Sequence, residues 1–284
     1  MSLGRGWLAL LLGAATATAA PLNDDLGHPV EIDLPARRLV SLAPHVTELL
    51  YAAGVGDRLV AAVDYSDYPP AARQLPRLGD ATRIDLERLL WFMPDLVIAW
   101  GSGTPARELA GVRRLGLPLY LSEPHRLEDI GEQLRVFGRL AGTQAVAAQA
   151  AWDYERRLAE LRRRYAATPP RPVFYQLALR PLLTVNATHT IHAVVSLCGG
   201  VNPFAELPEL TPRVTIEAVL AARPAAVIHA LYPGEDAAET ERFWRRHGLA
   251  ETTRFIAVPG DYIHRATPRI LEGVERICEG LAAE

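Results

Sequence analysis

The sequence predicts an α/β protein with two lobes, each built on a mostly parallel central sheet, joined by one long rigid α-helix. Three observations predict it: short apolar runs in both halves of the chain, one uninterrupted helical pattern between the halves, and a motif that occurs once in each half. Continuous apolar runs are typical of strands buried on both faces, and therefore of a parallel sheet. A single doubly wound domain explains neither the long helix nor the repeated motif.

The strands are expected at eight short apolar runs, which helical patterns or turn residues separate. These runs are 38–42, 59–63, 95–100 and 117–121 in the first half, and 172–177, 182–186, 225–230 and 255–258 in the second.

The segment between the halves predicts the connecting helix. It has no glycine or proline from Thr143 to Ala167 and is rich in Ala, Leu, Glu and Arg, all strong helix formers. Two prolines at 169 and 170 end it. We therefore expect an N-terminal lobe at 37–141, the connector at 142–168 and a C-terminal lobe at 169–284. Because such a helix resists bending, ligand binding should rotate the lobes by only a few degrees.

The first 19 residues are expected to form a signal peptide. Arg5 precedes an apolar stretch and a run of small residues, which is the pattern of a secretory signal. Of two A-x-A sites, the one ending at Ala19 is preferred, because cleavage after Ala20 would place Pro21 at the start of the mature chain. The alternative is a buried N-terminal helix. No other segment approaches the ~20 apolar residues of a membrane helix, so we expect a soluble, exported and monomeric protein.

Composition and cysteine content agree with this location. A net charge of −3 and a pI near 6.3 argue against a nucleic-acid binder, which usually carries a basic stripe. Cys198 and Cys278 are the only cysteines, and an oxidising compartment favours a bridge between them over two separate buried thiols.

The repeated motif places one glutamate in each half. Residues 83–100 and 213–230 both contain an arginine, a glutamate four residues later, a proline seven residues further on, and then an apolar strand. The glutamates are Glu87 and Glu217. One interpretation is a pair of exposed carboxylates that docks on two basic patches of a partner. The other is an anion favoured in the first helical turn, and from the residues alone this second interpretation is slightly the stronger.

Six segments carry a resemblance to a known family. They are 38–54, 65–72, 85–103, 196–204, 215–224 and 261–270. In this order and spacing the chain resembles periplasmic substrate-binding proteins whose lobes are joined by a rigid helix, and among them those that supply cobalamin to an ABC importer. The resemblance covers about residues 37–282. It implies cobalamin or a related corrinoid as ligand, docking of Glu87 and Glu217 on arginines of the two permease subunits, and a Cys198–Cys278 disulfide.

The ligand is expected between the lobes, at the carboxyl ends of the strands, where open α/β sheets place their sites. His45 and Tyr65 follow the first two strands, and Trp100 ends the third, before Gly101 and Ser102. A flat amphipathic macrocycle needs aromatic faces for its rim and polar groups for its amide side chains.

The resemblance extends this site and also shows departures from the family. It matches Tyr65 and Trp100 to ligand contacts and places Asp261 and Arg265 in the facing loop of the second lobe, with Tyr262 where a tryptophan is expected. Three positions where the family has further aromatic residues carry smaller side chains, Ala81, Leu183 and Thr211. These departures leave cobinamide or another metal chelate as alternatives.

Other ligands and a different class of function remain open at this stage. The wider family also carries haem, for which His45 or Tyr65 is a candidate axial ligand, and siderophores. His189 and His192 have a spacing suited to one helix face, but no third ligand is near, so no metal-ion site is expected. A secreted hydrolase would use Ser102 with His45, His264 and Asp261. Because no nucleophile elbow, P-loop or dinucleotide fingerprint is present, we expect a binding protein without a catalytic cofactor.

Overall fold

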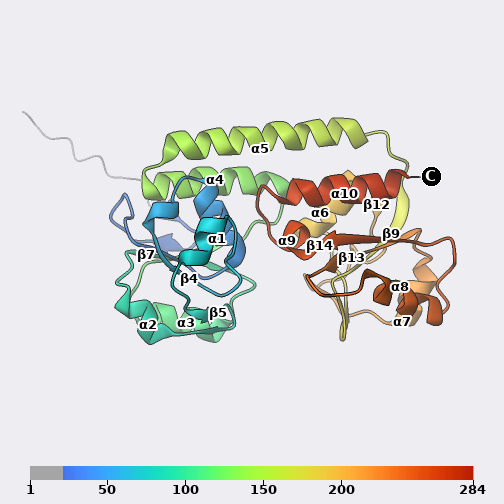
Figure 1. Ribbon diagram of the computed structural model, residues 1–284, viewed down its shortest axis with the longest axis horizontal. Helices are drawn as coiled ribbons and strands as arrows, with labels where there is room; N and C mark the ends of the chain where they lie inside the picture. Colours follow the sequence, from blue (N-terminus) through green and yellow to red (C-terminus); the bar gives the residue numbers. More distant parts are fainter. Residues whose placement is uncertain (1–21, 284) are drawn as a thin grey trace, which may run out of the picture.

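Two four-stranded parallel sheets, one in each half of the chain, form the centres of two lobes (Figure 1). The computed structural model describes residues 22–283, so the expected signal peptide lies outside the described residues. In spatial order, the first sheet consists of β4 (Leu59–Ala62), β3 (Leu39–Ser41), β7 (Leu96–Trp100) and β8 (Leu119–Ser122). The second consists of β12 (Gly200–Val201), β9 (Arg171–Gln176), β13 (Ala226–Leu231) and β14 (Arg254–Pro259). The predicted fold class is confirmed.

The helices surround these sheets on both faces. The N-terminal lobe has α1 (Pro44–Ala52), α2 (Leu86–Trp91), α3 (Ala106–Arg114) and α4 (Leu127–Ala141), with short 3-10 turns at Gly56–Arg58 and Pro70–Gln74. The C-terminal lobe has α6 (Thr190–Leu197), α7 (Ile216–Ala222), α8 (Ala237–Arg246), α9 (Gly260–Ile263) and α10 (Ile270–Ala282). Small antiparallel pairs complete the lobes: β1 (Leu22–Asn23) with β2 (Pro29–Val30), β5 (Gly79–Asp80) with β6 (Arg83–Ile84), and β10 (Ala178–Leu179) with β11 (Leu182–Leu183).

Both sheets have the same topology. Numbered by their occurrence in each half, the strands lie in the order second, first, third, fourth. The repeated motif occupies the same place in each lobe, because α2 leads into β7 and α7 leads into β13. Met93 and Arg223, which each precede the proline of the motif, even share a positive φ of 45°. The repeat therefore marks structurally equivalent positions.

One strand expectation is wrong and one strand was missed. Residues 182–186 do not join the parallel sheet; Leu182–Leu183 pair with Ala178–Leu179 in a hairpin that turns through Arg180-Pro181. The amides of Thr184 and Asn186 then donate to the carbonyls of Pro212 and Leu210 instead of to a sheet neighbour. The edge strand is Gly200–Val201, where two glycines in sequence gave no apolar run to recognise.

A single helix, α5 (Gln144–Tyr165), lies along both lobes (Figure 1). Gly142 ends α4 in the left-handed conformation with φ at 71°, which glycine adopts without a steric penalty, and α5 then runs back over α4. Ion pairs fix it to both lobes: Glu155 accepts from Arg135 of α4 at 2.5 Å, and Arg157 donates to Glu272 of α10 at 3.0 Å.

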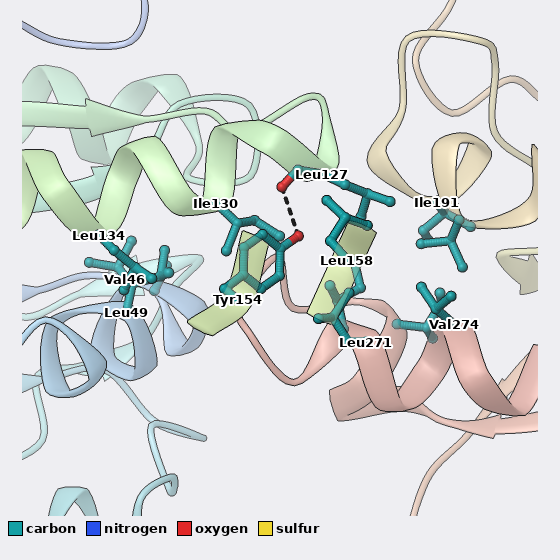
Figure 2. Close-up of a cluster of buried hydrophobic side chains, with 14 of the residues drawn as sticks. Val46, Leu49, Leu127, Ile130, Leu134, Tyr154, Leu158, Ile191, Leu271 and Val274 are labelled. Atoms are coloured by element: carbon teal, nitrogen blue, oxygen red, sulfur yellow. Dashed lines mark hydrogen bonds between the residues drawn. The ribbon is translucent and has the colours of Figure 1, made fainter. Parts of the chain in front are cut away.

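One continuous apolar core connects the lobes beneath α5 (Figure 2). On α4, Ile130, Leu134 and Phe137 are fully buried, and their spacing places them on one helix face. The Tyr154 hydroxyl of α5 donates to the Leu127 carbonyl at 2.7 Å. The same cluster continues through Leu158 into the second lobe. The lobes are thus joined by side-chain packing as well as by the chain itself.

The predicted disulfide is present. Cys198, at the end of α6, is bonded to Cys278 of α10, and both residues are fully buried. No helix within residues 22–283 is long and apolar enough to cross a membrane.

Candidate functional site

Two adjoining cavities lie between the lobes, at the carboxyl ends of the central strands. The first has a volume of about 510 Å³ and the second about 620 Å³. His45, Trp100 and His264 line both cavities, so these three rings stand between them. The first cavity continues to Ser102, Glu123 and Thr211, and the second continues to residues including Tyr65, Tyr232, Asp261 and Arg265.

His45 and Trp100 form the wall contributed by the N-terminal lobe. Pro44 starts α1 directly after β3, which places His45 in the first turn of the helix. Its ring meets Trp100 edge to face, with the ring centroids 5.2 Å apart. Burial, with the charge of Arg265, lowers the pKa of His45 to about 4, so the imidazole is neutral at ordinary pH. Its buried Nε2 has no hydrogen-bond partner among the described residues.

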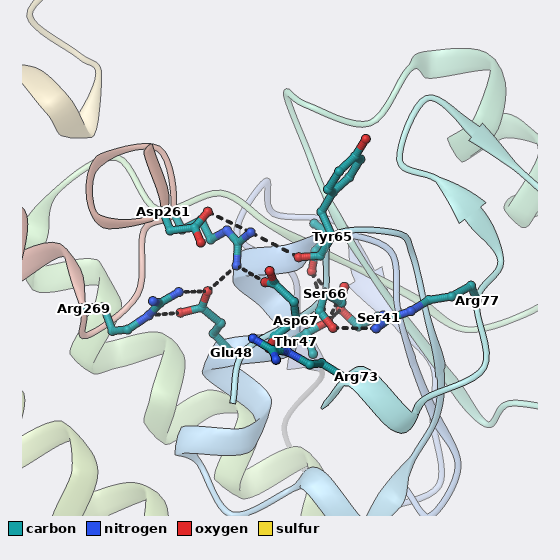
Figure 3. A network of polar contacts seen from close by, with 12 residues as sticks. Ser41, Thr47, Glu48, Tyr65, Ser66, Asp67, Arg73, Arg77, Asp261 and Arg269 are labelled. Atoms are coloured by element: carbon teal, nitrogen blue, oxygen red, sulfur yellow. Dashed lines mark hydrogen bonds and ion pairs between the residues drawn. The ribbon is translucent and has the colours of Figure 1, made fainter. Parts of the chain in front are cut away.

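Tyr65 extends into the second cavity from a constrained loop. The backbone φ of Tyr65 is 63°, an uncommon conformation for a residue with a side chain. Arg77 donates to the carbonyls of Val63 and Ser66, and Thr47 donates to the Ser66 hydroxyl at 3.0 Å. In Figure 3 the Tyr65 ring points away from these contacts, and the residue is 77% exposed. The loop therefore holds an aromatic face open toward a ligand.

Gly101 and Ser102 pack against a buried carboxylate. A Cβ added to Gly101 would lie 2.7 Å from Glu123 Oε2, so a larger residue there would displace this carboxylate. The Ser102 amide and hydroxyl both donate to Glu123, at 2.5 and 2.9 Å. Because this hydroxyl is directed at a carboxylate and not at an imidazole, the serine–histidine pair that a hydrolase would need is not formed.

Asp261 and Arg265 take part in a network of charged groups that crosses from one lobe to the other (Figure 3). Arg265 donates to Glu48 at 2.7 Å and to Asp67 at 2.9 Å, both in the N-terminal lobe, and pairs with Asp261 in its own lobe at 2.9 Å. Arg269 donates twice to the same Glu48, at 2.6 and 2.9 Å. The Glu48 side chain is only 2% exposed, so its charge depends on these two arginines.

The network also shifts the pKa values of Asp67 and Arg265. Burial alone would raise the pKa of Asp67, but the hydrogen bond and charge of Arg265 outweigh it and leave that pKa below its usual value. Burial alone would lower the pKa of Arg265, but hydrogen bonds to Glu48 and Asp67 raise it overall. Asp67 and Arg265 are therefore both charged at neutral pH.

The remaining expected site residues lie outside these two cavities or at their edge. Tyr262 is on α9 and its ring centroid lies 5.4 Å from the guanidinium of Arg269; it lines neither cavity. Of the three smaller side chains, Thr211 lines the first cavity, Ala81 packs against the N-terminal core, and Leu183 is half-buried in the β10–β11 hairpin.

The two histidines with metal-ligand spacing are engaged elsewhere. His189 caps α6 by accepting from the Ile191 amide at 3.1 Å, and His192 lies 3.2 Å from the Ser196 hydroxyl. Residues 22–283 contain no group of three or more histidine, cysteine, aspartate or glutamate side chains arranged to hold a metal ion.

Glu87 and Glu217 occupy equivalent exposed positions. Each lies in the first turn of its helix, α2 or α7. The caps themselves are other residues, because Asp85 accepts from the Arg88 amide and Thr215 accepts from the Ala218 amide. Both helices lie on the side of their lobe away from α5 (Figure 1). Within residues 22–283 no ion pair involves either glutamate.

Sequence reasoning missed several residues of the site, among them Tyr232, Glu48, Asp67 and Glu123. Tyr232 follows β13 and lines the second cavity. It is the equivalent of Ser102 in the repeat, since it stands 15 residues after Glu217 as Ser102 stands 15 after Glu87. The repeat was therefore a signal that could have found it. Glu48 gave no such signal, because its partners lie more than 200 residues away in the sequence.

Comparison with known proteins places the chain in a family. Residues 39–254 match the family model of periplasmic binding proteins. The chain belongs to this family. A vitamin B12-binding protein of Vibrio cholerae is 40% identical over 248 residues, covering 86% of this chain and 88% of the relative. A vitamin B12-binding protein of Photorhabdus laumondii is 36% identical over 245 residues, covering 86% and 87%.

Solved structures of the family have the same fold. The crystal structure of the periplasmic vitamin B12 binding protein BtuF of Vibrio cholerae matches with a TM-score of 0.77 at 39% identity, covering 87% of this chain and 97% of that one. A periplasmic haem-binding protein of Pseudomonas aeruginosa matches with a TM-score of 0.76 at 22% identity, covering 88% and 94%. At that lower identity the second match shows the fold alone.

Proposed function

We propose that this protein captures a corrinoid, cobalamin or a close relative, between its lobes in the periplasm and delivers it to an ABC importer. The observation that carries the proposal is the pair of cavities between the lobes, which Trp100 and His45 divide and Tyr65 borders. These rings offer aromatic faces to a flat macrocycle. Relatives that bind vitamin B12 and are up to 40% identical support the same ligand.

The proposed division of labour follows the two lobes. The N-terminal lobe (37–141) supplies the aromatic face, the C-terminal lobe (169–284) supplies the polar wall with Asp261 and Arg265, and the helical connector (142–168) keeps them in register. Glu87 and Glu217 dock on the two permease subunits. The bound cobalt is cargo, and the Ser102 hydroxyl, engaged by Glu123, supports binding without turnover.

Haem is the second candidate ligand, and one observation favours it. The neutral His45 imidazole has a buried Nε2 without a partner beside the cavities, and a neutral imidazole is an effective axial ligand for haem iron. A corrinoid and haem both offer a metal centre, so the distinction has to come from binding.

Titration calorimetry of the mature protein with cyanocobalamin, cobinamide and haemin, accompanied by absorption spectra, tests the proposal. We expect one corrinoid bound per chain and no haem spectrum that depends on His45. Trp100→Ala should weaken corrinoid binding by about tenfold or more, because a buried aromatic contact is lost. Trp91→Ala is the matched control, since Trp91 is 75% exposed on α2 and lines neither cavity. Haemin binding without corrinoid binding would contradict the proposal.

A further inference from the structure

Three side chains of the C-terminal lobe form a chain of hydrogen bonds that ends at the second cavity. The Tyr175 hydroxyl lies 2.8 Å from His264 Nε2, and the Tyr232 hydroxyl lies 2.7 Å from His264 Nδ1. Tyr175 comes from β9 and is buried, whereas Tyr232 follows β13 and is 43% exposed. The Tyr232 ring is seated on Gly260, where an added Cβ would lie 2.3 Å from it.

The proton on each atom of this chain can be assigned. Burial raises the pKa of Tyr175 well above its usual value, so the hydroxyl keeps its proton. That buried proton has one acceptor among the described residues, His264 Nε2, and leaving it without an acceptor would be costly. Tyr175 therefore donates to Nε2.

The hydrogen bond at Nε2 also determines which way the hydrogen bond at Nδ1 runs. Burial lowers the pKa of His264 to about 4, so at neutral pH the ring carries a single N–H. Since Nε2 accepts from Tyr175, the proton is on Nδ1, which donates to the Tyr232 hydroxyl oxygen. The Tyr232 proton is not used in this chain. Tyr232 lines a cavity whose other walls include Tyr65 and Trp100.

We propose that Tyr232 donates this hydroxyl proton to a carbonyl oxygen of the ligand, with His264 and Tyr175 as positioning residues that fix its direction. The inference rests on the proposed function, because the rim of a corrinoid carries carboxamide groups whose carbonyls accept hydrogen bonds. It also gives the C-terminal lobe an aromatic ring in a site where Thr211 is small.

The donor role is tested with Tyr232→Phe, which keeps the ring and removes the hydroxyl. The dissociation constant for cyanocobalamin and for cobinamide should rise about three- to tenfold, as for one lost hydrogen bond, while the Tm changes little. Tyr68→Phe is the matched control, because Tyr68 is also 43% exposed but lines neither cavity. Unchanged corrinoid affinity in Tyr232→Phe would overturn the donor role and leave the proposed function intact.

The positioning role has a spectroscopic signature that needs no ligand. Nitrogen-15 NMR of histidine-labelled protein, assigned with a His264→Gln variant, should show the proton of His264 on Nδ1. Tyr175→Phe should move it toward a mixture of tautomers and weaken corrinoid binding by less than Tyr232→Phe does. A proton on Nε2 in the unmodified protein would overturn the inference. If the unmodified protein binds no corrinoid, the proposed function and the donor role both fail, whereas the tautomer result stands separately.

Discussion

His45, His189 and His264 remain neutral near pH 6.5, where an exposed histidine would be partly protonated. Burial is the largest cause in each case, and it lowers each pKa to about 4. Neutral rings are suited to contacts with a macrocycle, since they bring no charge that must be desolvated. The same property makes the folded state sensitive to acid.

The thermal stability of the fold should therefore decrease as the pH falls through the window set by the pKa of His45. Between pH 6.5, its unfolded value, and pH 4, the unfolded state binds the proton and the folded state does not. Stability is full above pH 6.5 and decreases toward pH 4, by about 2 kcal/mol at pH 5 for one such group. Tm measured from pH 8 to pH 4.5 should fall less steeply in His45→Gln. The exposed His247→Gln is the control, and equal slopes in all three proteins would contradict the prediction.

Residue-scale reasoning from the sequence placed the N-terminal wall of the cavities but not its counterpart. His45, Tyr65 and Trp100 all follow or end predicted strands, and strand ends of a parallel sheet meet at one edge. They do line the cavities. Tyr175 and His264 meet through a contact between a strand and a helix end 89 residues apart, and no local pattern specifies such a contact.

The elements that carry Glu87 and Glu217 separate the two interpretations of the repeat. Asp85 and Thr215 already satisfy amides at the starts of α2 and α7, so the glutamates are not needed as caps. Their remaining first-turn role is interaction with the helix dipole, which is weak for an exposed side chain. Two equivalent exposed carboxylates on the same side of both lobes support docking instead.

Reversing both charges tests this at the level of the assembled importer. Glu87→Arg with Glu217→Arg should lower corrinoid uptake by roughly 30-fold or more, because each contact becomes a repulsion between like charges. Corrinoid affinity and Tm should change little, since neither glutamate lines a cavity. Glu239→Arg is the matched control, because Glu239 also lies exposed in the first turn of a helix, α8. Normal uptake by the folded double variant would favour the dipole interpretation. So would a fall in Tm large enough to account for the lost uptake by unfolding alone.

At the same scale, apolar runs predicted seven of the eight central strands that form the two sheets. The exceptions have local causes. Residues 182–186 have the apolar character of a strand, but the turn at Arg180-Pro181 folds them back on β10. Gly200–Val201 has almost no side chains to form a pattern, and its position is set by pairing with β9.

Within residues 22–283 two larger connections join the lobes, besides single contacts such as the Thr190 hydroxyl donating to the Pro124 carbonyl. Only the first of the two was visible in the sequence. The first is α5 with the apolar core beneath it. The second is the charged network in which Glu48 accepts from Arg265 and Arg269 across the cleft. Binding proteins joined only by flexible strands close through large hinge motions. Here the packing beneath α5 and the ion pairs of Glu48 both hold the lobes together, so we expect the lobes to move little relative to each other.

Removing the charge of Glu48 should therefore loosen the molecule as a whole. Glu48→Gln leaves two arginines with side chains 11% and 17% exposed without their shared carboxylate, which should cost about 2–4 kcal/mol of stability after allowance for their partial exposure. The distribution of distances between the lobes should also become broader, because α5 and the core beneath it are then the main connection that sets the angle between the lobes. Spin labels on cysteines introduced at Glu87 and Glu217 report this distance, since the native cysteines are paired.

The unmodified protein and Glu48→Gln should be compared both without ligand and with cobalamin. In the unmodified protein, cobalamin should change the mean distance between labels only slightly, as expected for a rotation of a few degrees. In Glu48→Gln the free protein should show a broad distribution that cobalamin narrows, because a ligand held by both lobes replaces the lost connection. Asp153→Asn, which disturbs an exposed ion pair on α5, serves as the control and should leave the distribution narrow. A narrow distance distribution in ligand-free Glu48→Gln would mean that α5 and the core beneath it fix the angle between the lobes without the charged network. The network would then contribute to the binding site and not to the rigidity of the molecule.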